Sequence, residues 1–259
     1  CHHAASTSSM EVLQKVKAKY VYGVSATPKR GDSMEKILYM LLGPLRHKFT
    51  ALERAAEQGI GHFFVPRYTR VVDNSESKDD INKAYALITS SEVRNNMIVE
   101  DVKSCVKEGK TPVILTRMKE HAKTLADNLK GSADHVFILY GDNSDKENLE
   151  IRTKLKQVPK NETLILVATG QKIGEGFDFP RLDTLMLAAP VSFEGRLEQY
   201  IGRLNRDFEG KEAVYVYDYV DSHVRYFDRM YGKRLRTYRK TGFSLWTGEI
   251  KSKQIINAI

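Results

Sequence analysis

Between residues 81 and 220, short apolar runs alternate with helical patterns, and this alternation constrains the fold more than any other feature. The apolar runs fall at Val113–Thr116, His135–Tyr140, Thr163–Thr169, Thr184–Ala188 and Ala213–Val220. The helical patterns cover roughly 81–89, 91–108, 118–130, 144–156 and 194–206. Short apolar strands that alternate with helices are typical of a parallel sheet covered on both faces. The sequence therefore predicts an α/β fold.

The first 80 residues follow a less regular pattern. It predicts a helix over 10–19, a short buried strand Tyr20–Val24, a helix Ser33–Leu42, a helix near 51–58 and a strand Phe63–Val72. Residues 73–80 are polar and lack apolar anchors, which is typical of a domain boundary. We expect two parts, 1–75 and 76–259. The first offers a thin core, so we expect it to be the end of another α/β domain whose main body lies upstream.

The composition limits the partners and the compartment. The net charge of +8 favours an anionic partner without identifying it. Two cysteines, Cys1 and Cys105, give no disulfide framework and fit a reducing compartment. No apolar run approaches the ~20 residues of a membrane span, and no signal peptide is visible. We expect a cytoplasmic protein without a membrane partner.

A basic helix is predicted over residues 225–240. Its basic residues are Arg225, Arg229, Lys233, Arg234, Arg236, Arg239 and Lys240, against a single acid, Asp228. Its apolar residues recur at helical spacing: Val224, Phe227, Tyr231, Leu235 and Tyr238. Two interpretations remain open, a solvated face and a phosphate-binding face.

One tempting motif does not predict a site. Gly109-Lys110-Thr111 has the ending of a phosphate-binding loop, but Ser104 stands where the first glycine is needed. Here a helix precedes and a strand follows, whereas a phosphate-binding loop runs from strand to helix. We expect Gly109 to end a helix and to begin the turn into the strand at Val113.

Four other stretches carry candidate functional residues. Ser25-Ala26-Thr27 and Leu115-Thr116-Arg117 end strands, where α/β proteins place ligands. The stretch Ala168–Pro180 follows a buried strand and carries three glycines, through which backbone N–H groups approach a ligand closely. The stretch Gln199–Arg206 contains two arginines three residues apart, on one face of a helix. Guanidinium groups stay charged and suit phosphate oxygens, although a solvated arginine face has the same pattern.

The order of these stretches, with Cys1-His2-His3 at the start, resembles superfamily 2 helicases. It is most similar to the branch of restriction-enzyme motor subunits and DNA-repair helicases. The resemblance spans nearly the whole chain and is firmest over 110–220. It implies a motor of two RecA-like lobes with ATP and Mg²⁺ between them. Residues 1–75 would be a remnant of the first lobe, and 76–259 a complete second lobe.

The resemblance also implies roles for individual residues. Arg203 and Arg206 would be arginine fingers, and Gln199 would sense the nucleotide state. The nucleotide side of the cleft would be lined by Gly176, Asp178 and Gly202. The nucleic-acid backbone, DNA by the family branch, would contact Thr116, Arg117, Thr169 and Lys172. Coupling between hydrolysis and strand movement would involve His2, Ser25 and Thr27.

One departure from the family pattern limits the activity expected of this chain. Cys1-His2 resembles the end of an Asp-Glu-x-His box, but the Asp and Glu are absent, as is a Walker A loop. We therefore expect a helicase C-terminal half that neither binds ATP tightly nor hydrolyses it alone. It would partner a missing first lobe or self-associate through the exposed remnant.

Two alternatives belong to other classes. In the first, the chain is a nucleic-acid-binding module without motor activity, acting through helix 225–240 and the Thr169/Lys172 loop. In the second, Cys1, His2 and His3 bind zinc. Adjacent residues rarely reach one tetrahedral ion and no fourth ligand is visible, so we expect no metal site.

Overall fold

In the computed structural model, all strands within the described residues lie parallel in one sheet of order β3-β4-β2-β5-β6-β1-β7. The structure describes residues 2–25, 35–47, 53, 59–141, 143–169, 178–191 and 194–248. The strands are β1 (Gly61–Tyr68), β2 (Pro112–Thr116), β3 (His135–Leu139), β4 (Leu164–Thr169), β5 (Thr184–Leu187), β6 (Ala213–Val220) and β7 (Ser244–Leu245). Every residue of β2, β4 and β5 is buried, as expected for strands covered on both faces.

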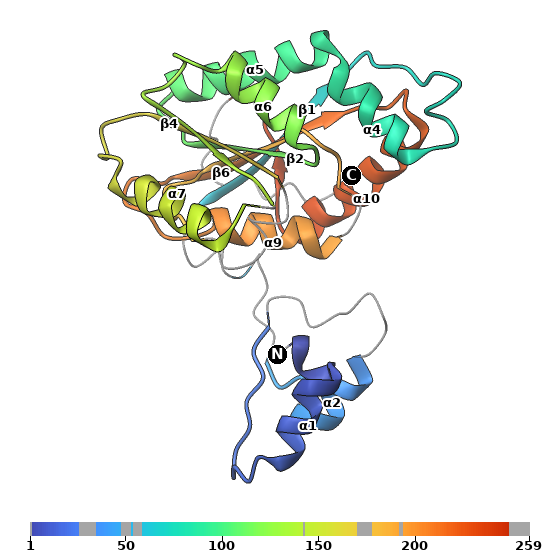
Figure 1. Ribbon diagram of the computed structural model, residues 1–259, viewed down its shortest axis with the longest axis vertical. Helices are drawn as coiled ribbons and strands as arrows, with labels where there is room; N and C mark the ends of the chain where they lie inside the picture. The colour runs from blue at the N-terminus through green and yellow to red at the C-terminus, as the bar shows by residue number, and fades with distance from the viewer. Residues whose placement is uncertain are drawn as a thin grey trace. The chain divides into compact units, whose positions relative to one another are not determined.

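Helices cover both faces of this sheet (Figure 1). They are α4 (Ile81–Ser90), α5 (Glu92–Lys107), α6 (Lys119–Asn128), α7 (Asp145–Gln157), α9 (Glu194–Leu204) and α10 (Arg225–Lys240). One apolar cluster joins α5 and α6 to the sheet, and a second joins α7, α9 and α10 to its other face. The predicted α/β fold is confirmed: it is a RecA-like parallel sheet between helices.

The chain divides by its contacts into two units, Cys1–Thr50 and Ala51–Ile259. This division differs from the boundary expected at residues 75–76. Strand β1 belongs to the second unit because it pairs with β6 over its whole length, from Gly61 opposite Ala213 to Tyr68 opposite Val220. The sequence pattern of β1 resembles that of any buried strand and does not reveal its partner.

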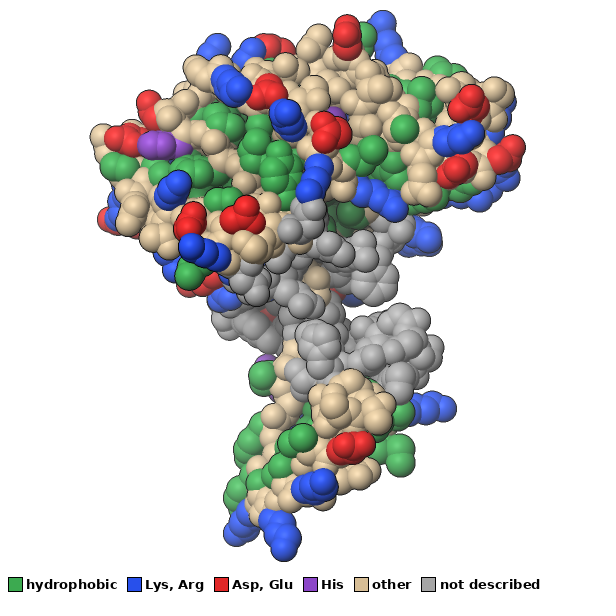
Figure 2. All heavy atoms as spheres, in the orientation of Figure 1, with side chains coloured by type: hydrophobic (Ala, Val, Ile, Leu, Met, Phe, Trp, Pro, Cys, Tyr) green, Lys and Arg blue, Asp and Glu red, His purple; other side chains and the backbone are tan. Residues whose placement is uncertain are grey.

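The first unit contains the short 3₁₀ helix η1 (His2–Ala5) with α1 (Thr7–Lys15) and α2 (Glu35–Leu42). Its buried apolar residues among those described are Ala5 and Leu38. The predicted strand Tyr20–Val24 is wrong: these residues form no regular structure, and Tyr22 is 86% exposed. A buried strand must pair its backbone with a neighbour, and the described part of this unit contains no other strand. Figure 2 shows apolar side chains on its surface.

Helix α5 ends as its sequence predicts. Gly109 has a φ of 79°, and the backbone N–H of Lys110 donates to the carbonyl of Cys105 at 2.9 Å. A second bond, from the N–H of Gly109 to the carbonyl of Val106, completes a Schellman motif. The Gly-Lys-Thr sequence is therefore a helix end that turns the chain toward β2.

The segment after α10 packs on the second unit. Phe243 is buried, β7 pairs with β1, and the N–H of Trp246 donates to the carbonyl of Phe64. The Trp246 ring lies 4.9 Å from that of Phe63 and 5.2 Å from that of Tyr215. Residues 249–259 and the predicted helix near 51–58 lie outside the described residues, apart from Glu53. No described helix is long and apolar enough to cross a bilayer.

Candidate functional site

Helix α9 positions the predicted nucleotide-side residues. Its inner face is buried at a spacing of three and four residues: Leu197, Tyr200, Ile201 and Leu204. Because 3.6 residues make one turn, the half-buried residues Gln199, Gly202 and Arg203 share the neighbouring stripe. The helix ends at Leu204, so Arg206 lies just beyond it. The predicted arginine pair therefore consists of one helical residue and one residue of the following turn.

Arg206 faces Asp178, another predicted nucleotide-side residue. The Nε of Arg206 lies 3.4 Å from Oδ1 of Asp178, and the two side chains are 42% and 60% exposed. This Nε is itself buried and makes no hydrogen bond within the described residues. Next to Asp178, Phe179 is buried in the cluster that contains the inner face of α9. The structure thus brings two sequence-distant site residues together.

Lys211 fixes the backbone around this pair. Its Nζ donates to the carbonyl oxygens of Leu204 and Arg206 at 2.9 Å each and of Leu182 at 2.8 Å. It also reaches the carbonyl of Pro180. One ammonium therefore joins the end of α9 to the segment between Asp178 and β5. Burial lowers the pKa of Lys211 to about 8, which leaves it mostly charged at neutral pH.

His62 supports the same turn from β1. Its Nε2 lies 2.8 Å from Oδ1 of the buried Asn205, and because that oxygen accepts, the Nε2–H donates. Burial lowers the pKa of His62, so the ring is neutral. Asn205 stands between Leu204 and Arg206, so this bond holds the turn that carries the second arginine against the sheet.

The predicted nucleic-acid residues end two neighbouring strands. Thr116 and Thr169 are the last residues of β2 and β4, which pair there directly. Both are buried: Thr169 Oγ1 accepts from the N–H of Gly141 at 2.6 Å, and Thr116 Oγ1 lies 2.7 Å from Nδ1 of His121. Arg117 is exposed, with its guanidinium 4.6 Å from the centre of the Tyr85 ring.

The hydroxyl proton of Thr116 can be assigned from its neighbours. Asn95 donates through Nδ2 to the carbonyl of Thr89, so its Oδ1 accepts from His121 Nε2 at 2.9 Å. His121 then carries its proton on Nε2, and its Nδ1 accepts from the hydroxyl of Thr116. Burial, and then the charge of Arg94, lower the pKa of His121 to about 3, which keeps the ring neutral.

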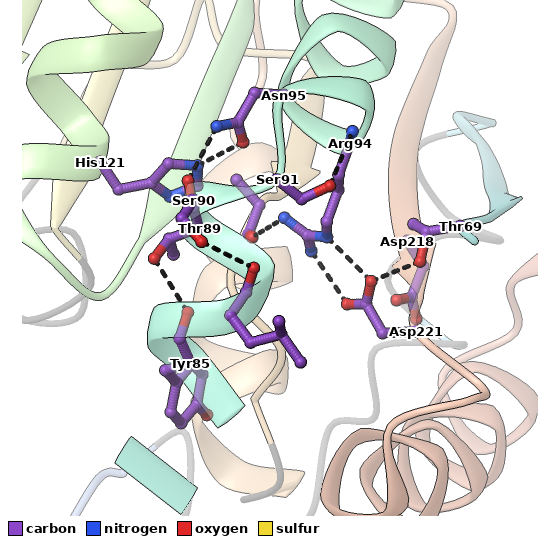
Figure 3. A network of polar contacts seen from close by, with 12 residues as sticks. Thr69, Tyr85, Thr89, Ser90, Ser91, Arg94, Asn95, His121, Asp218 and Asp221 are labelled. Atoms are coloured by element: carbon purple, nitrogen blue, oxygen red, sulfur yellow. Dashed lines mark hydrogen bonds and ion pairs between the residues drawn. The ribbon is translucent and has the colours of Figure 1, made fainter. Parts of the chain in front are cut away.

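A buried ion pair lies beside this network (Figure 3). Arg94 donates through Nε and Nη2 to the two carboxylate oxygens of Asp221, at 2.9 and 3.1 Å, and through Nη1 to the carbonyl of Ala188. The hydroxyl of Thr69 also donates to Asp221 at 2.6 Å. These contacts tie α5 to the carboxyl ends of β5, β6 and β1.

The two predicted groups thus lie at opposite edges of the sheet. Thr116 and Thr169 lie at the carboxyl edge, whereas Asp178 and Arg206 lie near the amino ends of β5 and β6. His2 and Ser25 belong to the first unit, and Lys172, Gly176 and Thr27 lie outside the described residues. Sequence reasoning missed the supporting residues His62, His121 and Lys211. A buried histidine or lysine within an apolar pattern would have been their only signal.

This arrangement is a RecA-like α/β fold. Residues 94–207 match the family described as helicase conserved C-terminal domain. Of solved structures, phage T4 UvsW shares 17% identity at a TM-score of 0.56, covering 82% of this chain and 45% of its own. Saccharomyces cerevisiae Dbp5 bound to RNA and ADP BeF₃ shares 13% identity at a TM-score of 0.50, and the match covers 85% of this chain and 50% of Dbp5.

Three curated relatives come from viruses. The putative helicase 161L of Invertebrate iridescent virus 6 is 27% identical over 248 residues, 93% of this chain and 54% of the relative. The transcript termination protein A18 of Myxoma virus is 25% identical, covering 61% of this chain and 34% of its own. The putative ATP-dependent RNA helicase L396 of Acanthamoeba polyphaga mimivirus is 22% identical, and the match covers 94% of this chain and 46% of the relative. The chain spans about half the length of these relatives or less.

Proposed function

We propose that this chain is the C-terminal motor lobe of an ATP-dependent nucleic-acid helicase or translocase. The observation that carries the proposal is the set of contacts that hold the turn after α9, which contains Arg206. Three elements hold Arg206 in place: the carboxylate of Asp178, the ammonium of Lys211 on its carbonyl, and His62 on the adjacent Asn205. A solvated arginine face needs no such support, whereas an arginine that must meet a phosphate does.

In this proposal Arg203 and Arg206 stabilise negative charge on a terminal phosphate. ATP with Mg²⁺ supplies the phosphoryl group whose hydrolysis drives movement. The residues fit a phosphate: the buried Nε of Arg206 has no hydrogen-bond acceptor among the described residues, and Asp178 is only a 3.4 Å ion-pair contact. Gln199, Gly202 and Gly176 would line the same side. The groups that bind ATP and Mg²⁺ in the resembling family lie on a first lobe, so the chain alone would bind nucleotide weakly.

Nucleic acid would bind at the opposite edge of the sheet. Arg117 and Lys172 would contact phosphates, and Thr169 a backbone oxygen. Thr116 already donates its proton to His121, so it would act as an acceptor or through its position. Such backbone contacts are independent of base sequence, as a translocating motor requires. The family branch favours DNA, although one relative is named an RNA helicase.

Coupling of the two edges would involve the first unit. His2, Ser25 and Thr27 would transmit the state of the nucleotide to the nucleic acid, as the resemblance implies. The exposed apolar side chains of this unit, among them Val12, Tyr22 and Val24, would pack against the rest of a first lobe. Without that lobe they would favour self-association.

The test is ATP hydrolysis by the protein at its natural length, with single-stranded DNA, with single-stranded RNA and without nucleic acid. The proposal predicts stimulation by nucleic acid and a loss of turnover in Arg206→Ala. If nucleic acid binds but no nucleotide is hydrolysed by the natural-length protein, the alternative of a binding module without motor activity replaces it.

A further inference from the structure

We propose that the outer face of α10 is a second contact for the nucleic-acid backbone. Five basic residues form this face, which we name the α10 stripe: Arg225, Arg229, Lys233, Arg236 and Lys240. The inference rests on the proposed function for the class of partner. It adds a binding surface that lies outside residues 94–207, the part that matches the helicase domain family.

The spacing of the α10 stripe makes it continuous. Its members are separated by four, four, three and four residues. At 3.6 residues per turn they fall within about 80° of the helix circumference and extend about 22 Å along it. Successive members lie about 5–6 Å apart, and Gly232, on the same side, adds no side chain to block approach.

The opposite side of α10 packs on the sheet and carries one buried basic residue. Arg234 is buried there and donates to both carboxylate oxygens of Asp218 at 2.8 Å. Tyr238 donates to the same carboxylate at 2.9 Å, and Phe227 is fully buried. The basic helix therefore has one arginine that holds the fold. The α10 stripe plays no part in these contacts.

Four of the five residues of the α10 stripe form no ion pair with a described residue. All five residues are exposed, and only Lys240 forms an ion pair with a described residue, at 2.9 Å from Glu198. Asp73 accepts from the backbone N–H of Arg225, and Asp228 is the one acid within the helix. By contrast, acidic and basic side chains mix on the surface over α7 (Figure 2). A row of cations is complementary to a polyanion.

The α10 stripe begins beside the predicted nucleic-acid edge. Arg117 lies over the ring of Tyr85, and that ring packs 4.8 Å from the ring of Phe227 on α10. The hydroxyl of Tyr85 also approaches Met230 Sδ at 3.9 Å. Figure 1 shows α4 and the start of α10 side by side. Helix α10, which carries the stripe, therefore neighbours Arg117 through Tyr85.

The chemistry of the α10 stripe identifies what it contacts. Its members are cations without an aromatic ring among them, which favours contacts to phosphates over the stacking of bases on rings. They would pair with successive phosphates of a DNA or RNA strand, without base preference. Because each phosphate contact releases counterions, the affinity must depend steeply on salt.

The test measures binding of this chain to fluorescent 20-nucleotide single strands, one of DNA and one of RNA, over a range of salt concentrations. The triple variant Arg229→Ala, Lys233→Ala, Arg236→Ala should bind at least ~10-fold more weakly at 0.1 M salt. Its log–log salt slope should fall by about 2, since each phosphate contact on a single strand contributes about 0.7. Arg229→Lys with Arg236→Lys should retain binding, because point charges suffice.

The matched control removes the same charge from scattered exposed positions, Lys107→Ala, Lys123→Ala and Lys154→Ala. Thermal unfolding verifies that every variant is folded. The proposal is overturned if the α10 stripe variant binds like the wild type, or if the control loses as much affinity and slope. If the wild type binds and the α10 stripe variant binds equally well, the proposal for the α10 stripe is refuted but the proposed function is not. Failure of the wild type to bind either strand refutes the proposed function as well.

Discussion

The carboxylate Oδ1 of Asp178 lies 3.4 Å from the Nε of Arg206 and joins the segment before β5 to the turn after α9. Because the two side chains are 60% and 42% exposed, such an ion pair contributes at most about 1 kcal/mol to stability. We infer that the pair orients the guanidinium instead. We predict that Asp178→Asn changes the free energy of unfolding by less than ~1 kcal/mol in urea titrations.

The same variant should affect turnover. A misoriented arginine lowers ATP hydrolysis by the natural-length protein on the order of 10-fold to 100-fold. Asp79→Asn, at an exposed position distant in sequence, is the control for loss of one carboxylate. Wild-type turnover in Asp178→Asn would show that Arg206 is oriented without it.

Lys211 should matter for stability as well as for position. Lys211→Met removes the donor from the carbonyls of Leu182, Leu204 and Arg206 and leaves them partly buried. We predict a loss of about 1–3 kcal/mol in the free energy of unfolding. Lys211→Arg should recover part of it, because a guanidinium donates to several carbonyls. If Lys211→Met is as stable as the wild type, the claim that Lys211 holds the turn after α9 is contradicted.

The buried pair of Arg94 and Asp221 predicts a larger effect. Both side chains are fully buried, so Arg94→Met leaves an uncompensated carboxylate in the interior. We predict a loss of about 3–5 kcal/mol, measured by denaturant unfolding. Arg67→Met is the comparison: Arg67 and its partner Asp101 are 42% and 12% exposed, so water still reaches this pair and the loss should be smaller. Equal losses in the two variants would contradict this account of burial.

His121 predicts a pH dependence with a defined sign. Burial lowers its pKa to about 3, below the ordinary 6.5 that it regains on unfolding. Between those pH values the unfolded chain binds a proton that the folded chain excludes. Stability is therefore lost as the pH falls from 6.5 toward 3, by up to a few kcal/mol.

The variant His121→Gln isolates this effect. Its amide can still bond Thr116 and Asn95 but does not titrate, so the stability advantage of the wild type should shrink between pH 7 and pH 4. Urea midpoints of both proteins at several pH values measure the difference, in which the carboxylates common to both cancel. Parallel pH profiles would contradict the assignment.

The strands of the second unit could be predicted because burial on both faces leaves a continuous apolar run. Val113–Thr116 and Thr184–Ala188 carry that signature, and both strands form where expected, to within a residue or two. Tyr20–Val24 carries it too, yet forms no strand. Apolar content predicts that a segment prefers burial, but it does not reveal whether a partner strand exists.

The sequence singles out the residues proposed for the candidate site but not the residues that support them. Arg203, Arg206 and Asp178 stand out because charged groups follow glycines or buried runs. Lys211 does not, because its acceptors are backbone carbonyls of two separate segments, which leave no trace in side-chain sequence. Arg234 has the same helical context as the α10 stripe, and only the position of Asp218 distinguishes it.

The central claim is that Arg206 acts on the nucleotide, and ATP hydrolysis with nucleic acid tests it most directly. The natural-length protein should hydrolyse ATP faster when DNA or RNA is added, and this chain alone should not hydrolyse it above an Arg206→Ala control. In the natural-length protein, Arg206→Ala should lower turnover on the order of 10³-fold or more, whereas the exposed control Arg70→Ala should leave it unchanged. Stimulated hydrolysis that survives Arg206→Ala would contradict the account.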